Sequence, residues 1–217
     1  MINDRYLIVY DYETTGINPH TCGITQIAAV VLHPRTLNVL DKFQRDNIKW
    51  RPNDTVEDKA FAITRKDKAY IEKSGVDPKQ AWGDYVNFVQ QYNKSKSSFN
   101  APIPCGYNII NYDNILTARY CKDYGPWDAK KNQQSLISSY MSYDLLHKMF
   151  WLTESTSEEV MPDIKLPTIS QLMGLDIEGA HDALVDTENC AKIITKFIRL
   201  DRYMFPKIKL KDAFKQS

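Results

Sequence analysis

The order of apolar and polar residues predicts strands in the first part of the chain. Residues 6–10 form an unbroken apolar run with aromatic and β-branched members, which is typical of a strand buried on both faces of a sheet. Residues 24–32 and 37–43 form two further runs, and the sequence His-Pro-Arg-Thr at 33–36 between them favours a turn. We therefore expect the chain to begin with a strand and a β-hairpin, which gives the sheet an antiparallel start.

Helical spacing follows a polar and irregular segment at residues 44–64. The apolar residues that mark one face of an amphipathic helix are Trp82, Tyr85, Val86, Val89 and Tyr92. Residues 93–104 are rich in Lys, Ser, Asn and Pro, which predicts a surface loop. A short strand ending near Tyr107 and a helix from residue 111 or 113 through 124 are expected next.

The last part of the chain is predicted to be mainly helical. Residues 141–144 resemble the end of a strand, and residues 145–151 are predicted to form a helix. The acidic segment 153–165 contains Pro162 and is predicted to form a loop. A short helix is expected at 167–173. The longest helix is predicted at 183–201, where apolar residues repeat at helical intervals.

Length and charge bear on the domain organisation and on the possible binding partners. The 217 residues are sufficient for one domain, with a core at about 5–200 and a short basic tail. With 28 basic and 27 acidic residues the formal charge is +1, so net charge does not indicate a nucleic-acid partner. Local lysines form either a phosphate-facing patch or ordinary solvated surface. They are Lys94, Lys96, Lys130, Lys131, Lys207, Lys209, Lys211 and Lys215.

The four cysteines, Cys22, Cys105, Cys121 and Cys190, are widely spaced, which predicts reduced and buried thiols rather than disulfides or a zinc site. The sequence starts without a secretory signal, and no apolar run approaches the length of a membrane span. We therefore expect a soluble, cytoplasmic protein without a membrane partner.

Two carboxylates follow the first predicted strand. Because strand side chains alternate with period two, Asp11 and Glu13 are expected to project to the same side. Like charges held together in a partly dry site need a cation between them, and oxygen ligands favour Mg²⁺ or Mn²⁺. Thr14, Thr15 and Gly16 offer hydroxyls and backbone N–H groups that suit a nucleotide phosphate or sugar. The alternative is an acidic turn after a strand.

Further candidate groups lie at the ends of later elements. Asp113 falls in the first turn of a predicted helix, a position that an acid also favours on electrostatic grounds alone. His181 precedes the final helix and Asp186 lies in its first two turns, while Asp182 and Asp144 are expected to cap helices. Together the four acids and the histidine predict a magnesium-dependent nuclease centre. His20, His33 and His147 lack such a context and are interpreted as structural.

These motifs resemble those of the DEDDh 3′-to-5′ exonucleases of the DnaQ-like group. The matching residues are Asp11-x-Glu13, Asp113 and His181-x-x-x-x-Asp186. Four segments look like the nuclease domain of bacterial exonuclease I: Asp-Tyr-Glu-Thr at 11–14, Gly-Tyr-Asn at 106–108, Tyr-Asp-Leu-Leu at 143–146 and His-Asp-Ala at 181–183. Ala-Ile-Thr at 62–64 is similar to the family's Gly-Ile-Thr, with alanine replacing glycine. We do not expect these 217 residues to include the further domains with which exonuclease I encircles single-stranded DNA.

The resemblance implies an RNase H-like α/β fold in which a mixed central sheet is flanked by helices. It also implies two Mg²⁺ or Mn²⁺ ions, one held by Asp11, Glu13 and Asp186 and a second by Asp11 with Asp113. His181, with an ordinary pKa of about 6.5, suits proton transfer from the attacking water near neutral pH. The expected reaction releases nucleoside 5′-monophosphates from the 3′ end of single-stranded DNA, in a bacterial or phage-like setting.

The sequence allows alternative predictions for the substrate contacts and the partners. Thr14, Thr15, Gly16, Ile63 and Asn108 are the predicted contacts, with Ile17 as a further group that covers the last bases. Tyr12 and Tyr107 either stack on bases or pack in the core. RNA cleavage of the ribonuclease T or oligoribonuclease type is one alternative to DNA cleavage, and a non-catalytic nucleic-acid-binding scaffold is another. A monomer is favoured, and a polymerase or repair protein is a candidate partner.

Overall fold

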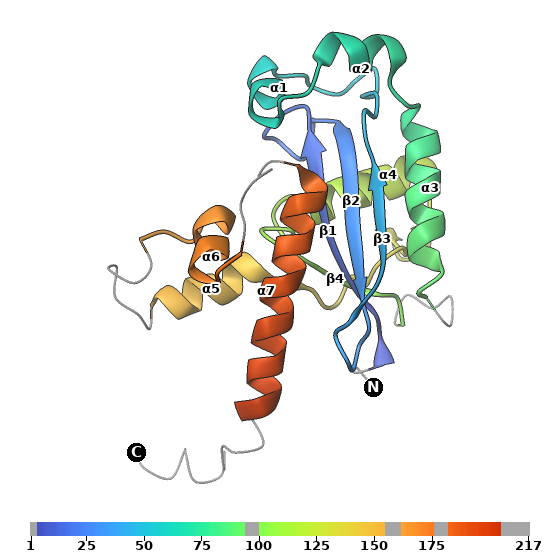
Figure 1. Ribbon diagram of the computed structural model, residues 1–217. Coiled ribbons are helices and arrows are strands. Elements are labelled where there is room, and N and C mark those ends of the chain that lie inside the picture. Colours follow the sequence, from blue (N-terminus) through green and yellow to red (C-terminus); the bar gives the residue numbers. More distant parts are fainter. Residues whose placement is uncertain (1–3, 94–99, 155–161, 176–181, 205–217) are drawn as a thin grey trace.

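A computed structural model describes residues 4–93, 100–154, 162–175 and 182–204. In these ranges the main sheet has five strands in the order β3-β2-β1-β4-β7 (Figure 1). They are β1 (Leu7–Thr14), β2 (Ile24–Leu32), β3 (Val39–Arg45), β4 (Ile103–Gly106) and β7 (Tyr143–Asp144). The β1–β2 and β2–β3 pairs are antiparallel, whereas β1–β4 and β4–β7 are parallel. The predicted mixed sheet is therefore confirmed.

Helices cover both faces of this sheet. On one face α3 (Pro78–Gln90) and α4 (Asp113–Tyr124) pack on Ile8, Tyr10 and Tyr12 of β1. On the other face α7 (Ala183–Met204) crosses the sheet, and α5 (Leu145–Thr153) and α6 (Leu166–Leu172) pack beside it (Figure 1). Leu7 and Val9 face this second layer. Because side chains of β1 alternate, Asp11 and Glu13 also belong to the face that α7 covers.

Two short helices lie beyond the carboxyl end of β1, in the region of Figure 1 above the sheet. They are α1 (Asp58–Thr64) and α2 (Lys68–Ser74). The prediction of an irregular segment at 44–64 is therefore wrong over its last residues. Each helix buries a single residue, Phe61 or Ile71, so neither leaves the repeating apolar stripe that predicts a helix from sequence.

Several predicted strand boundaries differ from the structure. Strand β1 continues to Thr14, beyond residue 10, and β7 begins at Tyr143 rather than at residue 141. Strand β3 begins at Val39 rather than at residue 37, because Leu37 has a φ of 60° and its N–H donates to the carbonyl of His33 in the turn. Strand β4 begins at Ile103, inside the segment predicted as a loop, and pairs with the parallel β1 at Leu7. The later helices α4 to α7 agree with the predicted positions to within about three residues.

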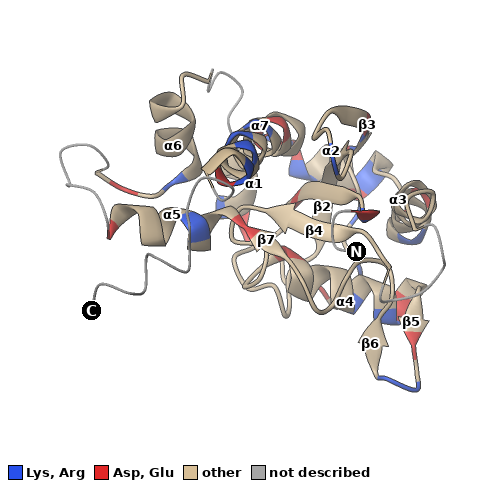
Figure 2. Ribbon diagram, turned by 90° about the horizontal axis from the view of Figure 1, so that it is seen from below, with Lys and Arg blue, Asp and Glu red and all other residues tan. Residues whose placement is uncertain are grey.

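A separate two-stranded ribbon joins β5 (Trp127–Asp128) to β6 (Gln133–Gln134). Figure 2 shows basic residues in several elements, including the turn between these strands, where Lys130 and Lys131 are exposed. The other lysines of the predicted basic patch lie outside the described residues, at positions 94, 96, 207, 209, 211 and 215. A phosphate-facing patch therefore stays a prediction.

The structure bears on two of the composition-based expectations. All four cysteines are free and buried, as predicted. Within the described ranges, no helix combines the length and apolar character needed to cross a membrane. The organisation of residues 1–217 as a single domain stays a prediction.

Candidate active site

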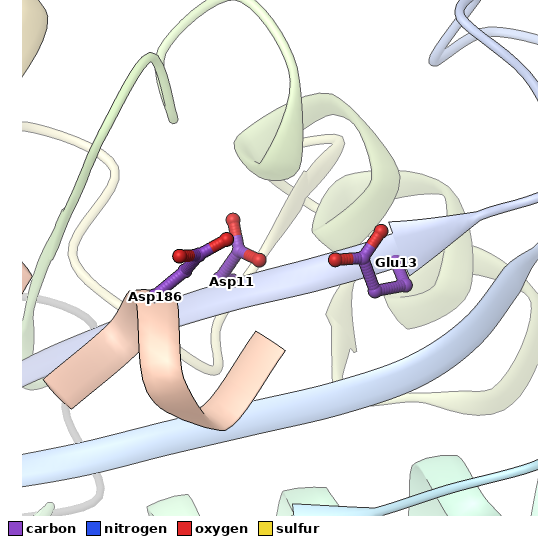
Figure 3. A group of neighbouring side chains, drawn as sticks. All are labelled: Asp11, Glu13 and Asp186. Carbon is purple, nitrogen blue, oxygen red and sulfur yellow. The ribbon is translucent and has the colours of Figure 1, made fainter. Parts of the chain in front are cut away.

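Three carboxylates from two elements meet at the end of the sheet that α7 covers (Figure 3). Asp11 and Glu13 lie two residues apart on β1, and Asp186 lies in the first turns of α7. Each offers an oxygen, and these oxygens all lie within 4.8 Å of one another. The predicted convergence of Asp11 and Glu13 is confirmed, and the fold brings Asp186 to them from a distant part of the sequence.

The electrostatics of this cluster fit a bound cation. Burial raises the pKa of Asp11 well above its ordinary value, and the nearby carboxylates of Asp113, Glu13 and Asp186 raise it further. Burial and then Asp186 raise the pKa of Glu13 to about 7, while the ammonium group of Lys66 opposes the shift. A divalent cation between the carboxylates removes the repulsion that raises these pKa values, and oxygen-only donors suit Mg²⁺ or Mn²⁺.

Lys66 is a basic residue near the cluster that the sequence did not reveal. It lies in the connection between α1 and α2, its side chain is 13% exposed, and its Nζ lies 3.9 Å from Asp46 Oδ1. In the sequence it stands between Arg65 and Asp67 with no motif that distinguishes it from a surface lysine. Only the folding of this connection toward Glu13 gives Lys66 its electrostatic effect.

Asp113 lies beside the three-carboxylate cluster rather than within it. It begins α4, is 3% exposed, and its Oδ1 accepts a hydrogen bond of 3.1 Å from the backbone N–H of Tyr12. Burial raises its pKa well above the ordinary value, although the N–H of Tyr12 lowers it. The charge of Asp113 also raises the pKa of Asp11, so the two carboxylates repel each other when both are ionised. Its role as a second ligand stays a prediction.

Tyrosine hydroxyls fasten α4 to β1 around this carboxylate. Tyr10 donates to Asn114 Oδ1 at 2.5 Å, and the hydroxyls of Tyr12 and Thr117 lie 2.9 Å apart. Tyr12 is 4% exposed and packs against Trp82. The suggestion that Tyr12 stacks on bases is therefore wrong, because its ring belongs to the core on the opposite face from Asp11.

Tyr107 is also used inside the protein. Its hydroxyl donates to the carbonyl of Ile164 at 2.8 Å, and its ring packs on the core that α7 covers. This contact favours the packing alternative over base stacking.

His33 is structural as predicted, because its Nδ1 accepts hydrogen bonds from the N–H groups of Arg35 and Thr36 in the turn.

The start of α7 is capped by Asp182, as predicted. Its Oδ1 accepts from the backbone N–H of Leu184 at 3.0 Å and of Val185 at 3.4 Å. Its carbonyl accepts from the N–H of Asp186 at 3.0 Å, which is the first helical hydrogen bond toward the candidate ligand. His181, the predicted proton acceptor, lies outside the described residues.

Asp144 holds the loop that carries Asn108. Its carboxylate caps α5 by accepting from Leu146 N at 3.0 Å, which confirms the predicted capping role. The same carboxylate accepts from the N–H groups of Asn108 at 2.9 Å and Ile110 at 3.0 Å. Asn108 therefore keeps a φ of 58°, a backbone conformation that asparagine tolerates better than most residues.

The loop after β1 separates the predicted substrate contacts into two kinds. Thr15 is fully buried, and its hydroxyl donates to the carbonyl of Thr55 at 2.5 Å and accepts from Gly23 N at 2.8 Å. A direct nucleotide contact by the Thr15 side chain does not fit this arrangement, because both hydrogen-bonding directions are used. By contrast, the predicted contact Ile63 is 56% exposed, and Ile17 is 81% exposed.

Tyr112, which sequence reasoning missed, fixes this loop from α4. Its hydroxyl donates to the carbonyl of Gly16 at 2.5 Å and lies 2.6 Å from Thr14 Oγ1. A side chain at Gly16 would also meet Glu57, since a Cβ placed there lies 2.5 Å from Glu57 Oε1. The loop is thus held in one position beside Asp113, the residue that follows Tyr112.

The raised pKa values predict how pH affects the stability of the metal-free protein. Glu13 has an ordinary pKa of 4.5 and a folded-state pKa of about 7. The folded state therefore binds the proton more tightly than the unfolded chain, and this stabilisation is fully present below pH 4.5 and lost as pH rises through 7. In EDTA, the unfolding temperature is expected to fall across this window, as measured by circular dichroism.

The variant Glu13→Gln provides the control for this expectation. It removes the titrating group, so the fall in unfolding temperature across the same window should become smaller. Saturating Mg²⁺ should also reduce the fall in the wild-type protein, because the cation stabilises the ionised carboxylates. An unfolding temperature that rises with pH in EDTA over this window would contradict the shift.

Comparison with known proteins shows the family to which the chain belongs. The family model described as exonuclease matches residues 8–194. A ribonuclease T from Buchnera aphidicola subsp. Baizongia pistaciae (strain Bp) is 26% identical over 205 residues, which cover 89% of this chain and 83% of the relative.

Solved structures show the same fold at lower identity. Escherichia coli exonuclease I in complex with a dT13 oligonucleotide has a TM-score of 0.65 and 20% identity, over 93% of this chain and 43% of that chain. A 3′-exonuclease in a structure of 3′-end-specific recognition of histone mRNA stem-loop has a TM-score of 0.58 and 16% identity, over 89% and 81%. The chain thus spans less than half the length of exonuclease I. By the match over residues 8–194, it belongs to the DnaQ-like family of 3′-to-5′ exonucleases, which hydrolyse phosphodiester bonds.

Proposed function

We propose that the chain removes nucleotides from the 3′ end of single-stranded nucleic acid as nucleoside 5′-monophosphates, with DNA as the favoured substrate. The observation that carries the proposal is the meeting of Asp11, Glu13 and Asp186, whose oxygens lie within 4.8 Å of one another. Such a set of hard oxygen donors is suited to phosphodiester chemistry that depends on a divalent cation.

The candidate site residues have separate roles in this proposal. Asp11, Glu13 and Asp186 hold one cation, and Asp11 with Asp113 holds a second. When bound, Mg²⁺ or Mn²⁺ lowers the pKa of water and stabilises the charge that develops on the departing 3′-oxygen. His181 takes the proton from the attacking water, because a neutral imidazole accepts protons near pH 7.

The 3′-terminal nucleotide is proposed to lie against the loop after β1. Thr14 and Gly16 are proposed to contact this nucleotide, and Tyr112 fixes the loop in which they lie. The exposed Ile63 offers apolar surface to a base. Asn108 is proposed to hydrogen-bond near the scissile phosphate, from a loop whose N–H groups Asp144 holds. An unpaired end suits this arrangement, because the chemistry must place a free 3′ terminus over the bound cations.

An RNA substrate is the second candidate, and a specific observation favours it. The relative that is named ribonuclease T matches this chain over 83% of its own length, whereas the exonuclease I structure matches over 43%. The likeness of the motifs at 106–108 and 143–146 to exonuclease I supports DNA. The two substrates differ in the 2′-hydroxyl, so the distinction depends on contacts to the sugar.

Initial rates on matched DNA and RNA strands test the substrate. Oligonucleotides of one sequence carry a label at the 5′ end and are incubated with Mg²⁺ or with Mn²⁺. We expect ladders that shorten from the 3′ end, with faster cleavage of DNA. Equal rates or faster cleavage of RNA would overturn the DNA preference. Binding of single strands without shortening, with metal present, would instead support a non-catalytic scaffold.

The cellular setting is part of the same proposal. We propose an intracellular enzyme, which the four reduced and buried cysteines support. A monomer is proposed as the active form, and a polymerase or repair protein as a partner. Co-purification from the native cell tests the partner, and light scattering of the purified chain tests the monomer.

A further inference from the structure

We infer that Gln26 is a positioning residue of the candidate active site, which fixes the start of α7 and thereby Asp186 against the strand that carries Asp11 and Glu13. The inference rests on the proposed function. It concerns how the third carboxylate is held in place rather than which groups carry out the chemistry.

Gln26 occupies an unusual position in the sheet. It lies on β2 directly opposite Glu13 of β1, and opposite residues of an antiparallel pair project to the same face. The side chain is 0% exposed, in a strand whose other residues are almost all apolar. A buried amide is costly unless its donor and acceptor are both paired, so its partners determine what this residue does.

Both halves of the Gln26 amide bind the start of α7. Nε2 donates to Asp182 Oδ2 at 3.2 Å, and Oε1 accepts from the backbone N–H of Ala183 at 3.3 Å. Asp182 uses its other oxygen to cap the helix at Leu184. A single side chain from the sheet therefore holds both the capping residue Asp182 and Ala183, the first residue of α7.

The hydrogen bonds continue from this point to the candidate ligand. The carbonyl of Asp182 accepts from the N–H of Asp186 at 3.0 Å. Gln26 thus connects β2 to Asp182, and Asp182 connects to Asp186, while the partner strand β1 carries the other two carboxylates. Ligand oxygens must be positioned to a fraction of an ångström, so loss of the Gln26 hydrogen bonds should weaken cation binding.

The variant Gln26→Leu tests the inference, with Gln134→Leu as a matched control. Gln134 is also a buried amide with both halves paired, to the backbone of Leu136 and Ile137, but it lies on β6 outside the main sheet. Both variants lose a buried amide of the same kind. Only Gln26→Leu is expected to weaken Mn²⁺ binding, by about 10-fold in a titration of free Mn²⁺ followed by electron paramagnetic resonance.

A reciprocal pair of variants keeps the test valid if Gln26→Leu fails to fold. Gln26→Glu places two carboxylates face to face, and Asp182→Asn places two amide N–H groups face to face while keeping a good N-cap. Combined, the two changes restore a donor opposite an acceptor and conserve the net charge. We expect each single variant to weaken Mn²⁺ binding about 10-fold, and the double variant to recover to within about 3-fold of wild type.

Cleavage assays separate this inference from the proposed function. In Gln26→Leu, kcat on a 5′-labelled single strand is expected to fall more than KM changes, because the substrate contacts stay in place. Unchanged Mn²⁺ affinity in Gln26→Leu, or an equal loss in Gln134→Leu, would overturn the positioning role. A wild-type protein that binds Mn²⁺ but cleaves no strand would overturn the proposed function alone, because the Mn²⁺ titrations still test Gln26.

Discussion

Replacing Asp186 by asparagine is expected to abolish hydrolysis, with a loss in kcat of at least about 1,000-fold, which corresponds to several kcal/mol of transition-state stabilisation. The reason is that Asp186 supplies one of the three oxygens that lie within 4.8 Å of one another. An amide is nearly the same size as a carboxylate but lacks its charge, so the shape of the site is kept. The measurement is single-turnover cleavage of a 5′-labelled strand in saturating Mg²⁺.

The same variant is expected to keep or increase the stability of the metal-free fold. Asp186 raises the pKa of both Asp11 and Glu13 by repulsion, and its neutralisation removes that repulsion. The unfolding temperature of Asp186→Asn in EDTA at pH 8 should therefore equal or exceed that of wild type. A matched control is Asp201→Asn, which changes a surface carboxylate of the same helix that pairs with Lys148 at 3.3 Å. Asp201→Asn should cleave at the wild-type rate. If Asp186→Asn kept a tenth or more of the wild-type rate, the role of Asp186 as a cation ligand would be refuted.

Replacing His181 by alanine is expected to lower kcat by a factor of about 100 to 10,000. The resemblance to the DEDDh motif assigns this residue to accept the proton from the attacking water. An imidazole with an ordinary pKa of about 6.5 is protonated below that pH, so the wild-type rate should fall as pH drops through this value. The measurement is the pH–rate profile of both proteins on the same labelled strand.

Two observations sharpen the test of His181. In His181→Ala, the rate should no longer fall as pH drops through about 6.5. Added imidazole should restore part of the lost rate. The control His147→Ala changes an exposed histidine on α5 and should leave the rate unchanged. A loss smaller than about 10-fold in His181→Ala would mean that another group accepts the proton.

Local patterns in the sequence were sufficient to predict the parts of the site that follow element periodicity. The alternation of β1 places Asp11 and Glu13 on one face, and the helix that follows Asp182 brings Asp186 into its first turns. The same kind of pattern predicted the helices that bury an apolar stripe. It missed α1 and α2, because each buries only one side chain.

The residues that sequence reasoning missed act through contacts between distant segments. Gln26 is 156 positions away from Asp182, and Tyr112 is 96 positions away from Gly16. Neither belongs to a motif that indicates its partner. The same limit explains why Thr15 was predicted to contact substrate, since its hydroxyl is used by Thr55 only after the loop folds back. Periodicity reveals which face a residue occupies, and not which hydrogen-bond partner it meets there.

The cation site is tested most directly by locating Mn²⁺ with anomalous X-ray scattering in crystals of the protein soaked in that cation. We predict an anomalous peak between the carboxylates of Asp11, Glu13 and Asp186, with oxygen distances of about 2.1 to 2.2 Å. A well-ordered site without such a peak at saturating Mn²⁺, or a peak bound only by other residues, would contradict this prediction.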